Sequence, residues 1–215
     1  MPCDASGMAE IHRLYKTGFG EGPTLVDGVR EGDAAHAAVV AQHLSTLSAS
    51  LHAHHEFEDG EFWGPLAERA PACALHVDRM KQQHAEMLVH LEAMDEALPV
   101  WRASGRSAEA EPIREALAGI NAALAEHLPD EEENIVPVME SVLTQKEVDA
   151  AGEHGRKATP KGQAFPMLGG ILAAQPDGGT EWMNKHLPPP VRVIWRLLGK
   201  RRYDAHRHAL VHGPH

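Results

Sequence analysis

The stretch HLSTLSASLHAHHEFEDGEFWGP, residues 43–65, decides the fold class. Within it, residues recur at three- and four-residue spacing along one stripe of an amphipathic α-helix: Leu44, Leu47, Leu51, His54 and Glu58. Upstream, Asp33 is a suitable N-cap, and Pro65 or Pro71 is expected to end the helix. The stretch therefore predicts a long helix that carries a polar pair, His54 and Glu58, among its core positions.

Three further segments carry helical patterns. One follows Pro71 and runs to Pro99 and the loop at 103–105, one begins near Ser107 and extends past residue 138, and a weaker one covers residues 5–29, where three glycines and Pro23 interrupt it. No stretch shows the period-two alternation of a strand, and short connections between long helices favour antiparallel neighbours. We therefore expect an all-α fold, an up-down-up-down four-helix bundle formed by residues 1–143.

Residues 144–215 are predicted to form short additional helices, because proline and glycine divide this region into small pieces. Residues 191–215 hold six Lys and Arg against one acidic residue, so the remaining chain, with 14 basic and 30 acidic residues, has a formal charge of −16. The favoured interpretation is an amphipathic extension whose apolar residues pack on the bundle: Val193, Ile194, Trp195, Leu197 and Leu198. Alternatives are an acidic partner, a membrane surface, or a homo-oligomer formed through this extension.

Composition excludes several classes of protein. Of 215 residues, 43% are hydrophobic and 24% charged, which supports a sizeable core and rules out wholesale disorder. The net charge of −11 argues against nucleic acid as a partner. Cys3 and Cys73 are far apart, so neither a disulfide scaffold nor a thiolate metal site is indicated. We find no signal peptide and no apolar run long enough for a transmembrane segment, and we expect a cytoplasmic protein.

Histidine is in excess, with sixteen residues. Four of them have an acidic residue four positions later, namely His52 with Glu56, His54 with Glu58, His55 with Asp59, and His127 with Glu131. About two such pairs are expected by chance at this composition. The spacing within one helix therefore cannot distinguish a functional pair from a coincidental one.

The register between helices does distinguish them. His12 and His54 are 42 residues apart and His84 and His127 are 43 apart, so each half of the chain supplies a lone histidine and then an HxxxE motif. Antiparallel packing would bring four imidazoles and two carboxylates to one level of the core, where burial is costly unless they are satisfied. Two metal ions bridged by Glu58 and Glu131 would satisfy all six groups, inside apolar walls formed by Leu51, Leu88, Leu124 and Ile135.

The order His, HxxxE, His, HxxxE on four successive helices resembles the hemerythrin-like, or HHE cation-binding, domain over about residues 8–142. The opening IHRLYK, the long second helix and the C-terminal region are also similar to bacterial members of actinobacterial type. The resemblance implies a four-helix bundle with two non-haem iron ions, oxo- or hydroxo-bridged. It also implies the metal ligands His12, His54, Glu58, His84, His127 and Glu131.

Two departures limit what the resemblance implies. Oxygen-carrying hemerythrins have HxxxH on the third helix, whereas His84 has Met80 and Leu88 four residues to either side. This pattern resembles the iron-sensing F-box hemerythrin-like domain and some mycobacterial proteins, so reversible oxygen carriage is not implied. Pro129, between His127 and Glu131, is expected to kink the fourth helix. Tyr15, one turn beyond His12, could ligate metal or hydrogen-bond beside it.

Three function classes follow. The first is a non-haem di-iron protein that reacts with peroxide, dioxygen or nitric oxide in oxidative or nitrosative stress protection, with catalase-like peroxide decomposition as its enzyme activity. The second is an iron- or oxygen-sensing or binding module without catalytic turnover. The third is a metal-free helical interaction protein. The Glu-x-x-His spacing of ferritin-like carboxylate proteins is absent, as are phosphate-binding loops and a nucleophile elbow, so we expect no organic cofactor and no catalytic side chain.

Overall fold

The computed structural model describes residues 2–214, and the described chain is helical throughout with no strand. The α-helices are α1 (Gly7–Asp27), α2 (Ala34–Phe57), α3 (Trp63–Arg69), α4 (Ala74–Ser104), α5 (Ser107–Asn134), α6 (Val136–Val142), α7 (Gln145–Ala158), α8 (Ala164–Ala174), α9 (Thr180–His186), α10 (Pro189–Ile194) and α11 (Lys200–His212). Two π-helical segments, η1 (Glu58–Phe62) and η3 (Trp195–Gly199), and one 3₁₀ turn, η2 (Pro71–Cys73), complete the list. The predicted all-α class is confirmed.

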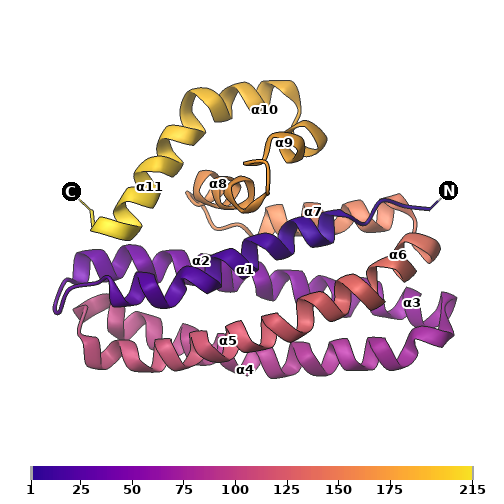
Figure 1. Ribbon diagram of the computed structural model, residues 1–215, viewed down its shortest axis with the longest axis horizontal. Helices are drawn as coiled ribbons and strands as arrows, with labels where there is room; N and C mark the ends of the chain where they lie inside the picture. The colour runs from indigo at the N-terminus through magenta and orange to yellow at the C-terminus, as the bar shows by residue number, and fades with distance from the viewer. Residues whose placement is uncertain (1, 215) are drawn as a thin grey trace.

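Four long helices, α1, α2, α4 and α5, lie side by side in alternating directions (Figure 1). Helix α1 packs against α2 and α5, and α4 packs against the same two helices from the other side. Short connections join α1 to α2 and α4 to α5, as expected for antiparallel neighbours, whereas η1, α3 and η2 connect α2 to α4. The bundle therefore has the up-down-up-down topology that the helical patterns predict.

Local sequence explains where the helices begin and end. The Asp33 carboxylate accepts a hydrogen bond from the backbone N–H of His36 and caps α2. Gly105 ends α4 in the left-handed conformation, at φ 65°, and its N–H donates to the Trp101 carbonyl. Helix α2 does not run on to Pro65, however, because its regular part ends at Phe57 and the π-helical turn η1 follows.

The predicted interruption of the first helix is wrong, since α1 is continuous through its glycines and Pro23. A Cβ at Gly18 would lie 2.7 Å from a methyl carbon of Leu47, and one at Gly22 would lie 2.9 Å from a methyl carbon of Leu117. These glycines therefore let α1 approach α2 and α5 closely, and their packing role outweighs their low helix propensity.

The buried apolar residues form two clusters with a polar layer between them. The larger cluster includes Phe19, Leu51 and Leu124, and the smaller one includes Met80 and Ile135. On each long helix, the predicted ligand histidine lies between members of the two clusters, for example between Met80 and Met87 on α4. Trp63, Trp101 and Met80 are fully buried members of these clusters. The bundle thus encloses a polar layer from both ends.

Residues 144–214 add a layer of helices on one side of the bundle (Figure 1). Helix α7 packs on α2, α8 packs on α1, and α11 packs on both α2 and α8. Two polar contacts hold α11 in place: Arg207 forms a bidentate ion pair with Glu21, and the His36 ring lies 2.8 Å from the Leu210 carbonyl oxygen. His36 thus has a structural role.

The predicted packing of the apolar residues in the extension is wrong for four of the five. Trp195 is buried, but Val193, Ile194, Leu197 and Leu198 are 51, 46, 71 and 54% exposed. The segment leads away from the bundle before α11 returns to it, so these side chains have no bundle surface to cover (Figure 1). No helix in the described part of the chain is both long and apolar enough to cross a membrane.

Candidate metal centre

The structure brings all six predicted ligands together in the polar layer. Helix α1 supplies His12, α2 supplies His54, the first π-helical residue is Glu58, α4 supplies His84, and α5 supplies His127 and Glu131. Five of these residues are buried, and the His54 side chain is 9% exposed. Residues up to 119 positions apart in sequence thus share one small volume.

Each glutamate lies between histidines of different helices. Glu58 has one carboxylate oxygen 3.2 Å from His54 Nε2 and the other 3.5 Å from His84 Nε2. Glu131 Oε2 lies 3.2 Å from His12 Nε2 and 3.7 Å from His127 Nε2. Both carboxylates therefore occupy positions from which they could contact two ions at once.

Three of the imidazoles are oriented through their other ring nitrogen. The Nδ1 atoms of His12, His84 and His127 lie 2.9, 2.9 and 3.0 Å from the side-chain oxygens of Glu132, Asp59 and Gln83, respectively. A carboxylate or amide oxygen can only accept, so each Nδ1 carries the proton and donates it. In the neutral form of each ring, the Nε2 lone pair then faces the centre of the layer, which is the usual arrangement of metal-binding histidines.

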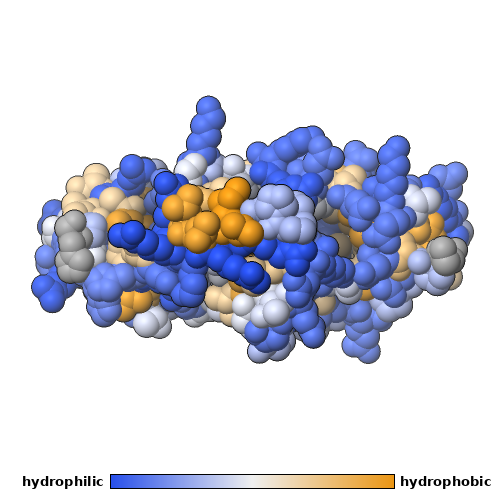
Figure 2. Space-filling view, turned by 90° about the horizontal axis from the view of Figure 1, so that it is seen from above, coloured by the Kyte–Doolittle hydropathy of each residue, from blue (hydrophilic) through white to orange (hydrophobic). Residues whose placement is uncertain are grey.

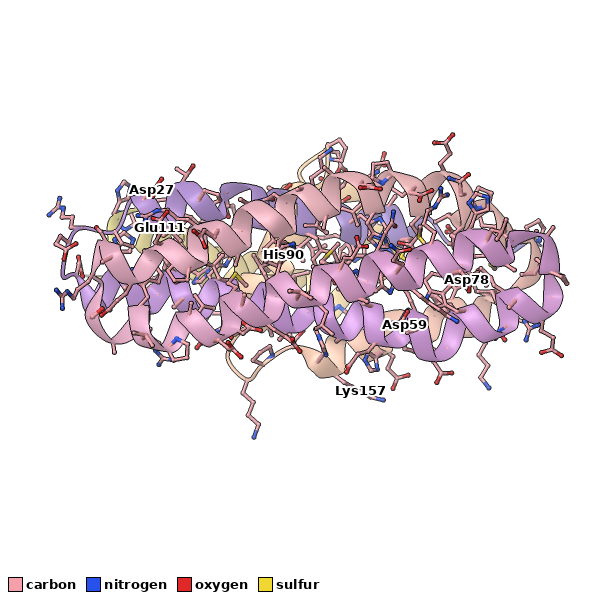
Figure 3. All side chains as sticks on the ribbon, turned by 90° about the horizontal axis from the view of Figure 1, so that it is seen from below. Asp27, Asp59, Asp78, His90, Glu111 and Lys157 are labelled. Carbon is pink, nitrogen blue, oxygen red and sulfur yellow. The ribbon has the colours of Figure 1, made fainter. Side chains whose placement is uncertain are left out.

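Two of these orienting residues, Asp59 and Gln83, are fixed by further hydrogen bonds. Asp59 accepts a further hydrogen bond from the Trp63 indole at 2.6 Å, and Gln83 donates to Asp130 at 3.4 Å. Asp130 in turn forms an ion pair with Arg79. Figure 3 labels Asp59 toward one end of the bundle, far from Asp27 and Glu111 at the other end, so the site lies off-centre along the bundle axis.

The helical patterns did not single out two of these contacts. Glu132 directly follows the HxxxE motif and its side chain is 41% exposed, yet it contacts His12. Asp59 stands four residues after His55, yet its oxygen contacts His84. A pattern within one helix could not show either contact, because both join two different helices.

Burial and neighbouring charges keep two of these imidazoles, those of His54 and His127, neutral. Burial and the nearby His12 hold the pKa of His54 well below its ordinary value, and burial lowers the pKa of His127 to about 4. Burial also lowers the pKa of His12, but contacts with Glu131 and Glu132 outweigh it and raise that pKa to about 9. Metal ligation requires neutral imidazole, so His54 and His127 are ready donors at neutral pH.

The two glutamates differ in their ionisation. Burial, reinforced by repulsion from Glu131, raises the pKa of Glu58 well above its ordinary value. Burial acts on Glu131 in the same direction, but its contact with His12 dominates and lowers its pKa to about 2. Two adjacent buried carboxylates cannot both be charged at low cost without a cation nearby.

Several buried atoms of the layer have no hydrogen-bond partner: both carboxylate oxygens of Glu58 and of Glu131, and the Nε2 atoms of His55, His84 and His127. Each such atom costs about 1–3 kcal/mol if it stays unsatisfied. Three groups of donors could hold a metal ion, with their ligand atoms within 4.8 Å of one another, namely His12 with His54 and Glu131, His54 with His55 and Glu58, and His55 with His84 and His127. Nitrogen and oxygen donors of this kind suit iron, so the residues present fit the expected metal.

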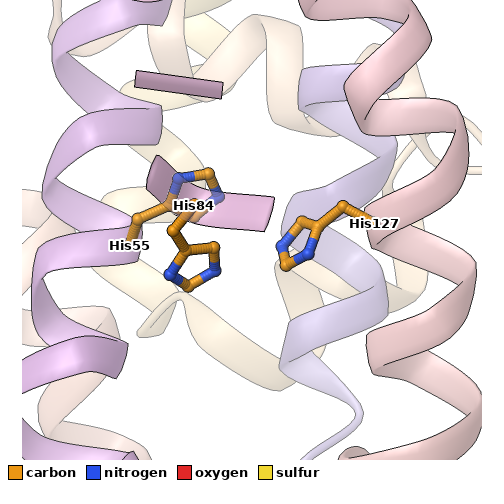
Figure 4. Close-up of side chains that lie close together, drawn as sticks. All are labelled: His55, His84 and His127. Carbon is orange, nitrogen blue, oxygen red and sulfur yellow. The ribbon is translucent and has the colours of Figure 1, made fainter. Parts of the chain in front are cut away.

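His55 is the residue that the sequence analysis did not select. It is 6% exposed, and its ring stacks on that of His84 with the centroids 4.0 Å apart and the planes at 12° (Figure 4). The His127 ring meets it edge-on at 5.3 Å. The one available signal was its pairing with Asp59 at four-residue spacing, and this signal was shared with other histidines.

Three other expectations concern the surroundings of the layer. The Tyr15 hydroxyl donates to the Ser50 carbonyl at 3.1 Å, and its ring lies 5.4 Å from that of His54. Helix α5 continues past Pro129 to Asn134, so His127 and Glu131 stay on one helix. Leu88 is only partly buried, and Met87 takes the fully buried position on α4 instead.

Comparison with known proteins agrees with this geometry. The model of the family described as "Hemerythrin HHE cation binding domain" matches residues 10–139. This span contains all six predicted ligands. No curated protein and no solved structure matches the chain. The match covers more than half of the chain, and the polar layer lies within it. The chain therefore belongs to the hemerythrin HHE cation-binding domain family.

Proposed function

We propose that this chain is a non-haem di-iron protein that reacts with peroxide, dioxygen or nitric oxide and so protects against oxidative or nitrosative stress. The ligands are His12, His54, Glu58, His84, His127 and Glu131. Membership of a cation-binding family supports iron, and the polar layer supplies nitrogen and oxygen donors for it. One observation carries the proposal: unsatisfied carboxylate oxygens and imidazole nitrogens from α2, η1, α4 and α5 converge at one buried level, where His12 of α1 joins them.

The number of donors supports two ions. The layer offers two carboxylates with four oxygens, together with at least four imidazole nitrogens, which is more than one ion accommodates. Each glutamate lies between histidines of two helices, within 3.7 Å of both. We assign Glu58 and Glu131 a bridging role on this ground.

The chain contributes binding, orientation and exclusion of water. Iron in such a site supplies Lewis-acid and redox chemistry toward a small molecule. Glu132, Asp59 and Gln83 fix three imidazoles by accepting their Nδ1 protons. Buried Leu51 and Leu124 cover the layer on one side, which lowers the dielectric around it and keeps bulk water away.

A binding or sensing module without turnover is the second candidate. The observation in its favour is the attachment of α11, which is held by Glu21 on α1 and His36 on α2. These two helices also carry His12 and His54, so a change in metal occupancy could alter how α11 is held. In that case the readout is the position of α11, and no substrate is consumed.

Iron content and optical spectroscopy of the purified protein test the proposal. We expect about two irons per chain and the near-ultraviolet absorption of an oxo-bridged ferric pair. A protein that binds no iron after anaerobic reconstitution would instead be the metal-free helical interaction protein. Oxygen release from peroxide then separates turnover from sensing.

A further inference from the structure

We infer that His55 is a seventh metal ligand, which supplies a fifth imidazole to the centre from α2. This inference rests on the proposed function. His55 belongs to two of the three donor groups in the layer, and its Nε2 is buried without a hydrogen-bond partner. A histidine that only filled space would be expected to hydrogen-bond through its ring, since a buried polar atom without a partner is costly.

Ring geometry assigns His55 to the same ion as His84 and His127. Its centroid is 4.0 Å from that of His84 and 5.3 Å from that of His127, whereas 5.5 Å separates it from His54 (Figure 4). The donor atoms of the three histidines lie within 4.8 Å of one another. Donors about 2 Å from a common ion lie about 3–4 Å apart. The His55 and His84 rings would tilt out of their parallel stack so that both Nε2 atoms point at the ion that His127 faces.

His55 thereby replaces an imidazole that α4 does not supply. His84 has no histidine one turn away on its own helix, where buried Met80 packs in the smaller apolar cluster. The parallel stack places the His55 ring beside the His84 ring, where a second donor from α4 would otherwise stand. The centre then has three imidazoles on one side, from His55, His84 and His127, and two on the other, from His12 and His54.

This asymmetry places the exchangeable position on the side of His12 and His54. That side has fewer nitrogen donors, and the Tyr15 ring lies 5.4 Å from the His54 ring there. Small-molecule ligands are therefore expected to bind beside Tyr15. The Tyr15 hydroxyl is engaged with the Ser50 carbonyl, so it remains in the surroundings of the site.

The test replaces His55 by phenylalanine, which keeps an aromatic ring stacked on His84 but removes the nitrogen donor. His52→Phe, an exposed position three residues earlier on α2, is the matched control. Iron affinity is measured by chelator competition, and Mössbauer spectra of the loaded protein report the two iron environments. We expect His55→Phe to bind iron roughly tenfold more weakly or worse and to change one of two quadrupole doublets, and His52→Phe to match the wild type.

The outcomes separate this inference from the proposed function. Wild-type affinity and unchanged Mössbauer doublets in His55→Phe would show that His55 only stacks, and would overturn the inference while leaving the di-iron centre in place. Full retention of iron by Glu58→Ala would overturn the centre itself. Circular dichroism melting of each variant without metal checks that the bundle is folded.

A second, independent observation concerns the segment 191–198, which we propose binds an anionic phospholipid membrane surface. Five of its eight residues are exposed and aliphatic: Val191, Val193, Ile194, Leu197 and Leu198. Figure 2 shows a contiguous hydrophobic patch on the face over α10, with strongly hydrophilic atoms beside it. Contiguous exposed apolar surface of this kind marks an interaction site, whereas single exposed residues such as Leu75 do not.

The charges around this patch select the partner. Arg196 lies among the aliphatic residues, and Lys200, Arg201 and Arg202 follow them; all four are exposed. Residues 1–190, in contrast, carry a formal charge of −16. Aliphatic side chains flanked by basic ones are typical of helices that lie in the interface of anionic bilayers. A second copy fits less well, because a symmetric pairing of this patch would bring like charges together.

Vesicle co-sedimentation tests this proposal with the full chain. We expect binding to vesicles that contain phosphatidylserine, weak binding to phosphatidylcholine alone, and a loss of roughly tenfold or more in the double variant Leu197→Ser/Leu198→Ser. Leu75→Ser, which removes an 83% exposed leucine from α4, is the matched control and should bind as the wild type does.

Wild-type protein that stays in the supernatant, or a double variant that binds unchanged, would overturn the membrane proposal. Size-exclusion chromatography with light scattering tests the alternative that a second copy of the chain binds this patch. A dimer that Leu197→Ser/Leu198→Ser dissociates would assign the face to a second copy of the chain, and would equally overturn it.

Discussion

The Nε2 atoms of His12 and His54 lie 3.3 Å apart, although the two residues are 42 positions apart in the chain. The His12 ring donates its Nδ1 proton to Glu132, so its neutral form has a lone pair on Nε2 that faces His54. Two buried lone pairs at this separation repel each other unless a proton or a cation lies between them. Either a proton on one Nε2, donated to the other ring in a hydrogen bond, or a metal ion between the two atoms removes this repulsion.

Removing either of the carboxylates to which we assign a bridging role should remove most of the iron. We expect Glu58→Ala and Glu131→Ala to fall from about two irons per chain to well below one, because each loses two oxygens between two histidines. Iron is measured by inductively coupled plasma mass spectrometry on the desalted protein. Glu56→Ala, whose side chain is 63% exposed on the same helix, should keep its iron. If both bridging variants retained full iron, the ligand assignment would be wrong.

Iron removal should lower the melting temperature. A ligand at 100 times its dissociation constant stabilises the folded state by about 2.7 kcal/mol, and for a chain of this size that corresponds to a fall of about 5–10 °C when the metal is removed. Differential scanning calorimetry with and without a chelator measures the shift. Glu58→Ala serves as the control, since a chelator should have little effect on it. Equal melting temperatures in the wild type would contradict the prediction.

Asp59 is expected to act through His84. Replacing it with alanine removes the acceptor for His84 Nδ1 and frees the Trp63 indole, so iron affinity should fall about tenfold to a hundredfold. Asp59→Asn keeps an accepting oxygen and should retain most of the affinity. Chelator competition distinguishes the two. If Asp59→Asn lost as much affinity as Asp59→Ala, charge would matter more than ring orientation.

The sequence could predict the bundle and the level of the polar layer because both depend on periodicity. The 42- and 43-residue separations place His12, His54, His84 and His127 at one height of antiparallel helices, whatever their exact crossing angles. The two HxxxE motifs add Glu58 and Glu131 on the same faces. These six residues follow from spacing alone.

His55 could not be found in this way. Adjacent residues on an α-helix point about 100° apart, so a single buried stripe accommodates His54 or His55 but not both. Helix α2 packs against both α1 and α4, however, and two adjacent residues can each face a different neighbour. His54 meets His12 of α1, and His55 meets His84 of α4. Which residues face two neighbours depends on the rotation of the helix, and spacing within one segment does not fix it.

The exposed residues of the C-terminal extension also show that periodicity does not predict which neighbour a helix face meets. Periodicity indicated that Leu197 and Leu198 belong to an apolar face, but it could not show what that face covers. The π-helical turn η3 and the path of α10 carry the segment away from the bundle. An amphipathic pattern predicts a face, and tertiary structure decides whether the face is buried.

The attachment of α11 should weaken as the pH falls from about 6.5 to about 4. Burial, together with His43 and Arg207, lowers the pKa of His206 to about 4, whereas a released α11 would protonate it near 6.5. The unfolded segment then binds more protons in this range, so docking loses up to about 1.4 kcal/mol per pH unit, less after solvent screening of this partly exposed group. Glu21 stays charged throughout, because His43 and Arg207 outweigh burial and hold its pKa at about 2.

Hydrogen exchange of residues 200–212 at pH 7 and pH 5 measures this effect. After correction for the slower intrinsic exchange at the lower pH, we expect lower protection factors at pH 5 than at pH 7 in the wild type. The difference should be smaller in His206→Gln, which cannot be protonated. His208→Gln, an exposed neighbour on α11, should behave as the wild type does. The same pH response in His206→Gln would show that another group controls the docking.

Peroxide should be consumed by the iron-loaded protein, with release of dioxygen. The chain provides a buried cluster of metal-binding side chains, and no nucleophilic side chain is needed for this chemistry. If His55 binds the ion that His84 and His127 hold, the exchangeable position would lie on the side of His12 and His54. Oxygen release is followed with an electrode at fixed iron concentration, so that weak metal binding is not mistaken for low activity. Glu131→Ala should lose the activity, and Glu56→Ala should keep it. A wild-type protein that instead bound dioxygen reversibly and left peroxide unchanged would be a binding or sensing module, because the same buried donors would then hold iron without turnover.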